Sequence, residues 1–218
     1  MEKPTIVFDL DGTLVDTITD IRLAVEAAVD DLDFGPLSDE LVQRFVGRGL
    51  GNTLRGVLSH FGYSADEAEL TQRLKRLMEY YRQNPSAESR PYPGIEELLD
   101  QLDNQGYRLG VLSNKEDGLV KSIVVTLFPS VPFVQIRGLR SGFVAKPDKR
   151  TLDEFRFSEQ SLIYIGDSEV DWQTAQNADV PAILVSWGFR PKDALQALDG
   201  SLTVDTIDEL EEAIYGIQ

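Results

Sequence analysis

The chain has 218 residues, of which 42% are hydrophobic and 27% charged, a balance typical of a globular protein that can bury a large core. It has no Cys and a single His, which excludes disulfides, thiolate nucleophiles, Cys-ligated zinc and multi-His metal sites. The formal net charge of −16 disfavours binding to nucleic acid and to anionic membranes.

The first segment of the chain is typical of a strand buried on both faces. Residues 5–8 are apolar and β-branched and show no alternation with polar residues. Asp9 and Asp11 interrupt the apolar stretch, and no cleavage-type sequence follows it, so we expect no signal peptide. No run of about 18 apolar residues occurs elsewhere, so no membrane span is expected. These features predict a cytoplasmic protein.

The next segment, residues 16–90, contains three or four helical patterns and no predicted strand. Turns separate these patterns at residues 34–36, 47–49 and 61–64. Ser38 and Ser64 mark predicted helix starts, and Ser64 with Glu67 three residues later matches a capping box. A proline-rich linker over residues 84–93 leads out of the segment. We therefore predict a small all-α domain over residues 16–90, named here the helical insertion.

The remaining residues alternate short apolar runs with amphipathic segments. The predicted strands lie at residues 107–112, 133–136, 162–165 and 182–185. The predicted helices lie at residues 95–105, 116–127, 149–155 and 169–178. Strands that alternate with helices imply right-handed crossovers and a parallel sheet with helices on both faces. The sequence therefore predicts an α/β fold with a Rossmann-like parallel sheet, made of residues 1–15 and 91–218.

The strongest chemical signal is the sequence at residues 9–13, directly after the first strand. Ligands bind beyond the carboxyl ends of parallel strands. The carboxylates of Asp9 and Asp11 share a small volume there, and their repulsion favours one ionised and one protonated group, which suits a nucleophile and a general acid. A calcium-binding EF-hand loop would need Gly and Glu where this chain has Leu14 and Asp20. A polar turn after a strand is the remaining structural interpretation.

A second acidic motif follows the predicted strand at residues 162–165. Asp167 and Asp171 are four residues apart at the start of a predicted helix, so they lie on one face of it. Acidic residues also stabilise helix N-termini, which is the structural alternative. Together with Asp9 and Asp11 they place four acids at two strand ends, and such hard oxygen ligands favour Mg²⁺.

Two weaker motifs follow other strand ends. Ser113 and Asn114 lie between a predicted strand and a predicted helix, where a hydroxyl and backbone amides could hold phosphate oxygens. The same pair is also a common helix cap. Lys146 precedes a predicted helix that starts near Pro147, and an isolated lysine is as readily a solvated surface charge.

These four motifs, in this order and at strand ends, resemble the sequence motifs of the haloacid dehalogenase superfamily. The resemblance covers residues 5–188, and within the family the chain is similar to phosphoglycolate phosphatases and related small-metabolite phosphatases. It implies that the helical insertion is a cap domain over the α/β domain. It also implies a Mg²⁺-dependent phosphatase that acts through an aspartyl-phosphate intermediate.

Carried over by position, the resemblance implies roles for the acidic residues. Asp9 would attack the phosphorus, and Asp11 would protonate the leaving group and later deprotonate the attacking water. Mg²⁺ would be held by Asp9, the backbone carbonyl of Asp11 and Asp167. Asp171 would support the metal, for example through water.

The resemblance also implies roles for the remaining motif residues. Ser113 and the Asn114 amide would bind the phosphoryl oxygens, and Thr13 would fix the loop around them. Lys146 would orient Asp9 and neutralise charge. It is physically reasonable that many polar and charged groups surround one phosphoryl group, because phosphoryl transfer depends mainly on positioning and charge stabilisation.

The leading hypothesis for the substrate is 2-phosphoglycolate, because Arg48 in the turn at residues 47–49 could pair with a carboxylate. An exposed arginine in a helix–helix turn is the structural alternative, and Lys115 and Arg190 are other candidate anion contacts. A phosphosugar mutase, a pyrophosphatase or nucleotidase, and a non-catalytic protein that binds Mg²⁺ and phosphate remain open. We expect a small phosphorylated metabolite as partner, no nucleic acid or membrane, and a monomer or homodimer. The linkers at residues 15–17 and 84–91 are candidate hinges.

Overall fold

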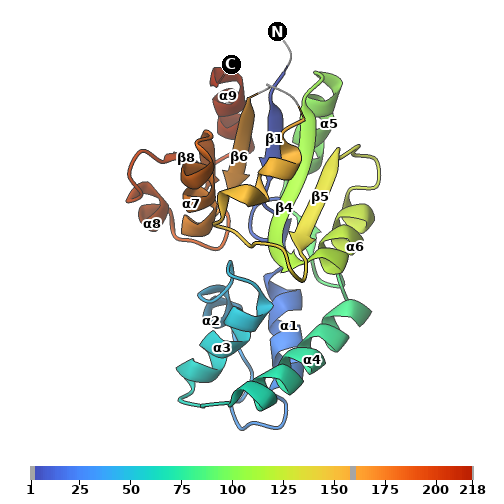
Figure 1. Ribbon diagram of the computed structural model, residues 1–218, viewed down its shortest axis with the longest axis vertical. Helices are drawn as coiled ribbons and strands as arrows, with labels where there is room; N and C mark the ends of the chain where they lie inside the picture. The colour runs from blue at the N-terminus through green and yellow to red at the C-terminus, as the bar shows by residue number, and fades with distance from the viewer. Residues whose placement is uncertain (1–2, 158–160, 218) are drawn as a thin grey trace.

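The computed structural model describes residues 3–157 and 161–217 (Figure 1). Within them, a six-stranded sheet has the order β5-β4-β1-β6-β7-β8, and every neighbouring pair is parallel. The strands are β1 (Thr5–Phe8), β4 (Arg108–Glu116), β5 (Gln135–Leu139), β6 (Leu162–Gly166), β7 (Ala182–Val185) and β8 (Leu202–Val204). The predicted α/β fold with a parallel sheet is thus confirmed.

Helices cover both faces of this sheet. They are α5 (Ile95–Asn104), α6 (Asp117–Leu127), α7 (Glu169–Ala178), α8 (Lys192–Gln196), α9 (Ile207–Gly216) and the 3₁₀ helices η1 (Lys149–Thr151) and η2 (Asp153–Phe155). Ile6 and Phe8 of β1 share a core with α5, α6 and α9, whereas Val7 shares a second core with α7, η2 and Leu152. Because both faces are buried, the strand carries apolar residues at successive positions and shows no alternation.

The helical insertion has a hydrophobic core that also includes Leu119 and Phe189 of the α/β domain. Its helices are α1 (Ile18–Ala28), α2 (Asp39–Gln43), α3 (Leu50–His60) and α4 (Glu67–Gln83). The chain enters the insertion through β2 (Val15–Asp16) and leaves it through β3 (Arg90–Pro91), and these two strands pair antiparallel. They lie next to the predicted boundaries at residues 16 and 90. Figure 1 shows the insertion at the end of the sheet toward which β4 and β5 point, while both termini lie at the opposite end.

Three local predictions differ from the structure. The predicted helix at residues 149–155 is two separate 3₁₀ turns, η1 and η2. The predicted capping box at Ser64 is wrong, because the α4 N-cap is Asp66, whose side chain accepts from the Glu69 amide at 2.8 Å. Ser38 does cap α2, as predicted. Finally, β8 and α9 were not predicted, since β8 is a three-residue strand at the sheet edge.

None of the helices in the described ranges is long and apolar enough to cross a membrane.

Candidate active site

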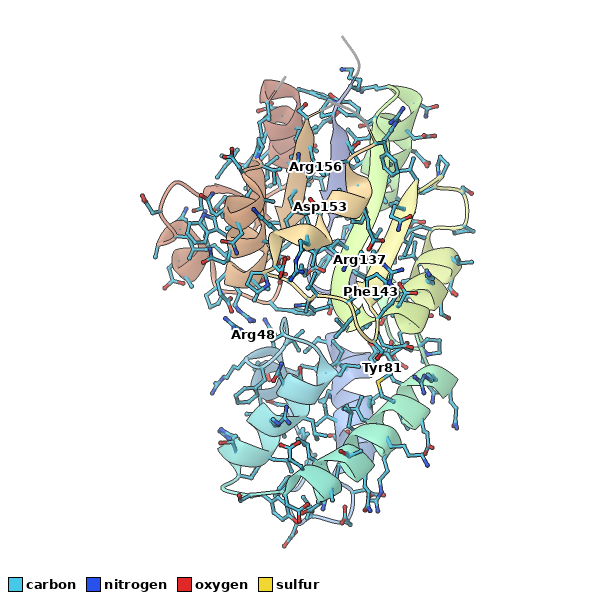
Figure 2. The ribbon with its side chains drawn as sticks, viewed as in Figure 1. Arg48, Tyr81, Arg137, Phe143, Asp153 and Arg156 are labelled. Carbon is cyan, nitrogen blue, oxygen red and sulfur yellow. The ribbon has the colours of Figure 1, made fainter. Side chains whose placement is uncertain are left out.

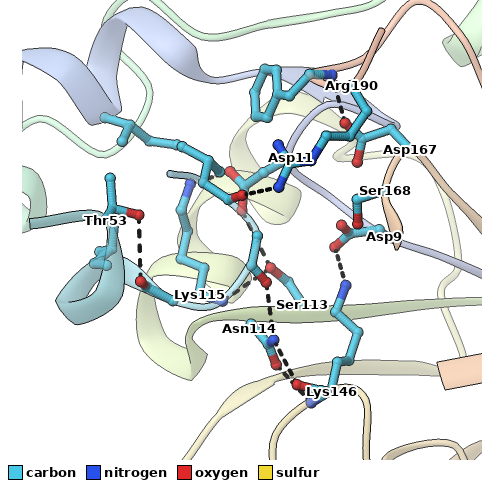
Figure 3. A pocket seen from close by; sticks show the side chains of 16 residues that line it. Asp9, Asp11, Thr53, Ser113, Asn114, Lys115, Lys146, Asp167, Ser168 and Arg190 are labelled. Atoms are coloured by element: carbon cyan, nitrogen blue, oxygen red, sulfur yellow. Dashed lines mark hydrogen bonds and ion pairs between the residues drawn. The ribbon is translucent and has the colours of Figure 1, made fainter. Parts of the chain in front are cut away.

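Six predicted motif residues line one cavity at the carboxyl ends of neighbouring strands, next to the helical insertion: Asp9, Asp11, Ser113, Asn114, Lys146 and Asp167 (Figure 3). β1 lies between β4 and β6, so the strand order reverses its direction at β1. Parallel sheets bind ligands at such a reversal point, beyond the carboxyl ends of the strands. The cavity there has a volume of about 30 Å³. The insertion contributes part of its lining, namely Ile21, Val46, Gly47, Gly49, Leu50 and Thr53.

Asp9 is held by one carboxylate oxygen and leaves the other without a partner. Its Oδ1 accepts from the Leu10 amide at 2.7 Å and lies 2.9 Å from Lys146 Nζ. No hydrogen bond from the described residues reaches Oδ2. Burial raises the pKa of Asp9 well above its usual value, against the attraction of Lys146. A further cation would therefore be needed to keep Asp9 ionised, as a nucleophile must be.

Three buried carboxylates gather at this point. Asp9, Asp167 and Asp171 each offer one oxygen, and these oxygens lie within 4.8 Å of one another. Burial, and next the negative charge of Asp171, raises the pKa of Asp167 to about 7. Asp167 Oδ2 accepts from the Phe189 amide at 2.6 Å, which leaves Oδ1 available. Such a cluster of oxygen donors suits a hard divalent cation, whose charge would allow all three to ionise.

Both carboxylate oxygens of Asp171 already accept hydrogen bonds from neighbouring side chains. Its Oδ1 accepts from Lys146 Nζ at 2.7 Å and from the Tyr164 hydroxyl at 2.9 Å, and its Oδ2 accepts from Ser168 Oγ at 2.5 Å. Burial opposes its charge, but Lys146 and these hydroxyls outweigh it and lower the pKa of Asp171. Asp171 therefore holds Lys146 beside Asp9, and its own oxygens are already engaged.

Ser113 and Asn114 line the cavity from β4, whose pairing with β5 becomes irregular after Leu112. The Asn114 side chain has a role that its sequence context did not indicate. Its Oδ1 accepts from the Lys146 amide at 2.8 Å, and its Nδ2 donates to the carbonyls of Lys146 and Gly47, each at 3.1 Å. Asn114 therefore fixes the backbone at Lys146 and also contacts the helical insertion.

Asp11 is held from two sides. Its Oδ1 accepts from Lys115 Nζ and from Thr17 Oγ1, the latter at 2.6 Å, and its Oδ2 accepts a longer bond of 3.3 Å from Ser113 Oγ. Its carboxylate is not part of the three-acid cluster. The metal contact expected of its backbone carbonyl stays a prediction.

Three predicted site residues lie outside the cavity lining, namely Asp171, Thr13 and Arg48. Thr13 is fully buried, and its carbonyl accepts from Trp187 Nε1 at 3.2 Å, so it lies behind the cavity. Arg48 is exposed where the insertion faces the α/β domain (Figure 2).

Among the candidate anion contacts, Lys115 and Arg190 do line the cavity. Arg190 pairs with Glu169 at 2.8 Å and donates to the carbonyls of Gln43 and Val46 at 3.3 and 2.6 Å. Its guanidinium therefore joins the α/β domain to the helical insertion beside the cavity.

Glycines make room for the acidic cluster. A Cβ at Gly12 or Gly188 would lie 2.3 or 2.5 Å from Asp167 Oδ2, and a Cβ at Gly166 would lie 2.3 Å from the Asp171 Cβ. Gly12 also has a positive φ of 85°, which favours glycine. Gly188 was not predicted, and the only signal for it is a glycine shortly after a strand end. The other unpredicted contributors are Thr17, Tyr164 and Ser168.

Comparisons with known proteins agree with this geometry. Residues 6–185 match the family model described as haloacid dehalogenase-like hydrolase. The chain is 32% identical to a phosphoglycolate phosphatase of Rhodospirillum rubrum, over 88% of this chain and 84% of the relative. It is 30% identical to one of Mesorhizobium japonicum, over 98% and 99%. A crystal structure from Lactobacillus delbrueckii, of a protein predicted to be a phosphoglycolate phosphatase, superimposes with a TM-score of 0.85 at 31% identity, covering 98% of this chain and 99% of that one.

Proposed function

The chain belongs to the haloacid dehalogenase-like hydrolase family, and from this premise we propose that it is a Mg²⁺-dependent phosphatase that hydrolyses a small phosphorylated metabolite through an aspartyl-phosphate on Asp9. The observation that carries the proposal is the position of Asp9 in the cavity lining beside Lys146 and two further acids, with no hydrogen bond to its Oδ2 from the residues that the structure describes. The named activity of the relatives supports the same reaction class.

In the proposed first step, Asp9 Oδ2 attacks the phosphorus of the ester. The bond from phosphorus to the leaving oxygen breaks, and this oxygen keeps the electron pair and takes a proton from Asp11. In the second step, water attacks the phosphorus and gives its proton to Asp11. The bond to Asp9 breaks, which releases inorganic phosphate and restores the carboxylate.

Lys146 and the cavity amides and hydroxyls reduce the repulsion between Asp9 and the phosphate dianion. Asp9 and Asp167 would hold Mg²⁺, with Asp171 in support, and the bound ion would supply positive charge near the phosphoryl oxygens. Lys146 Nζ is proposed to orient Asp9 through its contact with Oδ1. Ser113 and the amide of Asn114 are proposed to bind phosphoryl oxygens.

The proposed substrate is 2-phosphoglycolate, and the proposed cap is the helical insertion over residues 16–90. Arg190 supplies positive charge beside the cavity for a second anionic group, whereas Lys115 Nζ is engaged by Asp11 and Tyr81. Arg48 would contribute only if the insertion moved, because it is exposed and outside the lining.

The test is phosphate release from a panel of phosphorylated metabolites that includes 2-phosphoglycolate, with Mg²⁺ or EDTA. We expect Mg²⁺-dependent turnover that Asp9→Asn abolishes and that the exposed control Asp33→Asn retains. Isomerisation of a sugar phosphate without net phosphate release would indicate a mutase. Absence of turnover with every compound would overturn the proposed enzyme activity.

A further inference from the structure

One chain of contacts links the helical insertion to Asp11 through a buried lysine. Lys115, at the end of β4, is 3% exposed, and its Nζ donates to both Asp11 Oδ1 and the Tyr81 hydroxyl, the latter at 2.7 Å. Tyr81 is fully buried in the last turns of α4, and Lys115 Nζ lies 4.7 Å from the centroid of its ring. Figure 2 shows Tyr81 where α4 adjoins the α/β domain.

This arrangement treats the two oxygens of Asp11 differently. Oδ1 is anchored by Lys115 and by Thr17, whereas Oδ2 accepts only the 3.3 Å bond from Ser113 among the described residues. Oδ2 is therefore the oxygen that can most easily exchange its partner for a substrate oxygen or a water. A general acid or base works best when a third group fixes its other oxygen in this way.

The lysine depends in turn on the insertion. A buried ammonium group is costly unless it is paired and hydrogen-bonded. Of the two oxygen partners of Lys115 Nζ, one belongs to the α/β domain and the other to the insertion. If α4 moved away from β4, Lys115 would lose the Tyr81 hydroxyl and its fixed position, and Asp11 would lose a fixed anchor.

We propose that Lys115 and Tyr81 are positioning residues that orient Asp11 for proton transfer only while α4 lies against β4. The inference rests on the proposed phosphatase activity and adds a cap residue to it. Proton transfer by Asp11 would then follow closure of the insertion, because Lys115 orients Asp11 and receives its second hydrogen-bond partner, Tyr81, from the insertion.

The test exploits leaving groups of different basicity. An alkyl phosphate needs a proton on its leaving oxygen, whereas 4-nitrophenyl phosphate releases a weakly basic oxygen that needs none. Tyr81→Phe keeps the ring and removes the hydroxyl, and Tyr80→Phe on the same helix is the matched control, since Tyr80 is only partly buried and is not part of the cavity lining.

For the best alkyl phosphate, we expect Tyr81→Phe to lower kcat/KM by about tenfold, a fraction of the roughly 10²- to 10⁴-fold that general acid catalysis supplies. For 4-nitrophenyl phosphate, kcat/KM should stay within about twofold of wild type, while kcat falls because Asp11 must still deprotonate the water. Lys115→Met should show the same selectivity with larger losses, provided that its thermal unfolding remains cooperative.

Equal losses of kcat/KM on both esters, or no loss on either, would overturn the inference and leave the proposed phosphatase intact. A loss in Tyr80→Phe equal to that in Tyr81→Phe would overturn it too. Wild-type protein inactive on both esters would instead overturn the proposed function, and this inference with it.

Discussion

At the scale of single residues, the ammonium group of Lys146 lies between two buried carboxylates. Nζ is 2.9 Å from Asp9 Oδ1 and 2.7 Å from Asp171 Oδ1. Burial opposes its charge, but Asp171 and Asp9 raise the pKa of Lys146 above its usual value, which favours the charged ammonium group.

Lys146→Met should therefore reduce kcat by about 10²- to 10³-fold, the usual cost of removing one group that stabilises developing charge. The variant also leaves two acids without their cation, so its thermal unfolding must be followed beside its steady-state kinetics. Lys149→Met is the control, because Lys149 is exposed on the same segment. Activity of Lys146→Met within a few-fold of wild type would contradict the assigned role.

Asp167 makes the stability of the metal-free protein depend on pH. Its pKa is raised from 3.8 to about 7 by burial. Between these values the unfolded chain has released a proton that the folded protein retains, so the free energy of unfolding falls as the pH rises. This loss is absent below the unfolded pKa and complete above the folded one. Mg²⁺ should restore the stability, because it replaces the proton.

In EDTA, the melting temperature of wild type should therefore fall between pH 5 and pH 8, relative to that of Asp167→Asn. We expect a relative fall of at least about 3 °C, which is the shift that roughly 1 kcal/mol produces in a protein of this size. Calorimetry or dye-based melting across this range gives the measurement. Parallel pH profiles for wild type and Asp167→Asn would show that the Asp167 proton does not contribute.

At the scale of elements, the site depends on how closely the loops after β1, β6 and β7 approach one another. The loop after β7 brings Gly188 against the loop after β1: a Cβ there would lie 2.3 Å from the Gly12 carbonyl oxygen and 2.5 Å from Asp167 Oδ2. The contact partner is backbone, which cannot turn aside as a flexible side chain can. The three loops must therefore shift together if a side chain is added.

Gly188→Ala should lower stability by about 1–3 kcal/mol, as overpacking does, and lower kcat/KM by about 10²-fold through displacement of Asp167. Gly216→Ala is the control, since nothing lies within 4 Å of a Cβ at that helical position. Chemical denaturation and steady-state kinetics measure both effects. A Gly188→Ala protein as stable and active as wild type would show that the loops adapt without cost.

A second element-level feature ties the two linkers of the helical insertion together. Asp20, near the start of α1, is 2% exposed and accepts from the Ser89 amide at 2.8 Å, from Ser89 Oγ at 2.5 Å and from the Glu88 amide. The entry and return crossings are thus joined by a buried carboxylate as well as by β2 and β3. Any rotation of the insertion would turn both linkers as one unit.

At the scale of the whole molecule, the relative position of the insertion and the α/β domain determines the size of the cavity. The present cavity of about 30 Å³ is about the size of one or two water molecules, and we propose that it enlarges by movement of the insertion when substrate binds. We propose that residues 15–17 and 84–91 act as hinges, as the sequence suggested. Arg190 and Asn114, which donate to carbonyls of the insertion, would release it during opening.

This motion can be measured directly because the chain has no native Cys. Spin labels on cysteines introduced at Gln72 and Gln101, both exposed, would report one distance across the junction. We expect a broad or bimodal distribution without ligand that narrows when Mg²⁺ and a phosphate analogue are added. Identical distributions in both conditions would argue against hinge motion.

The sequence alone determined the fold class and the place of the site. Apolar runs without alternation indicate doubly covered strands, and parallel strands bring their carboxyl ends to one edge, so Asp9, Asp11 and Asp167 could be placed together from their positions after strands. The helical insertion was visible because its segment has helical periodicity and no strand pattern. These features are local or follow from general rules of topology.

The tertiary structure alone decided which side chains meet across the junction of the two domains. Tyr81 and Lys115 are 34 residues apart, and Arg190 is 147 residues from Gln43, yet each pair is in hydrogen-bonding contact. Such contacts depend on how the insertion and the α/β domain are placed against each other, and no local periodicity encodes that placement. Arg48 and Arg190 were both candidate anion contacts from the sequence, but only Arg190 lines the cavity, because packing sets the direction in which a turn faces.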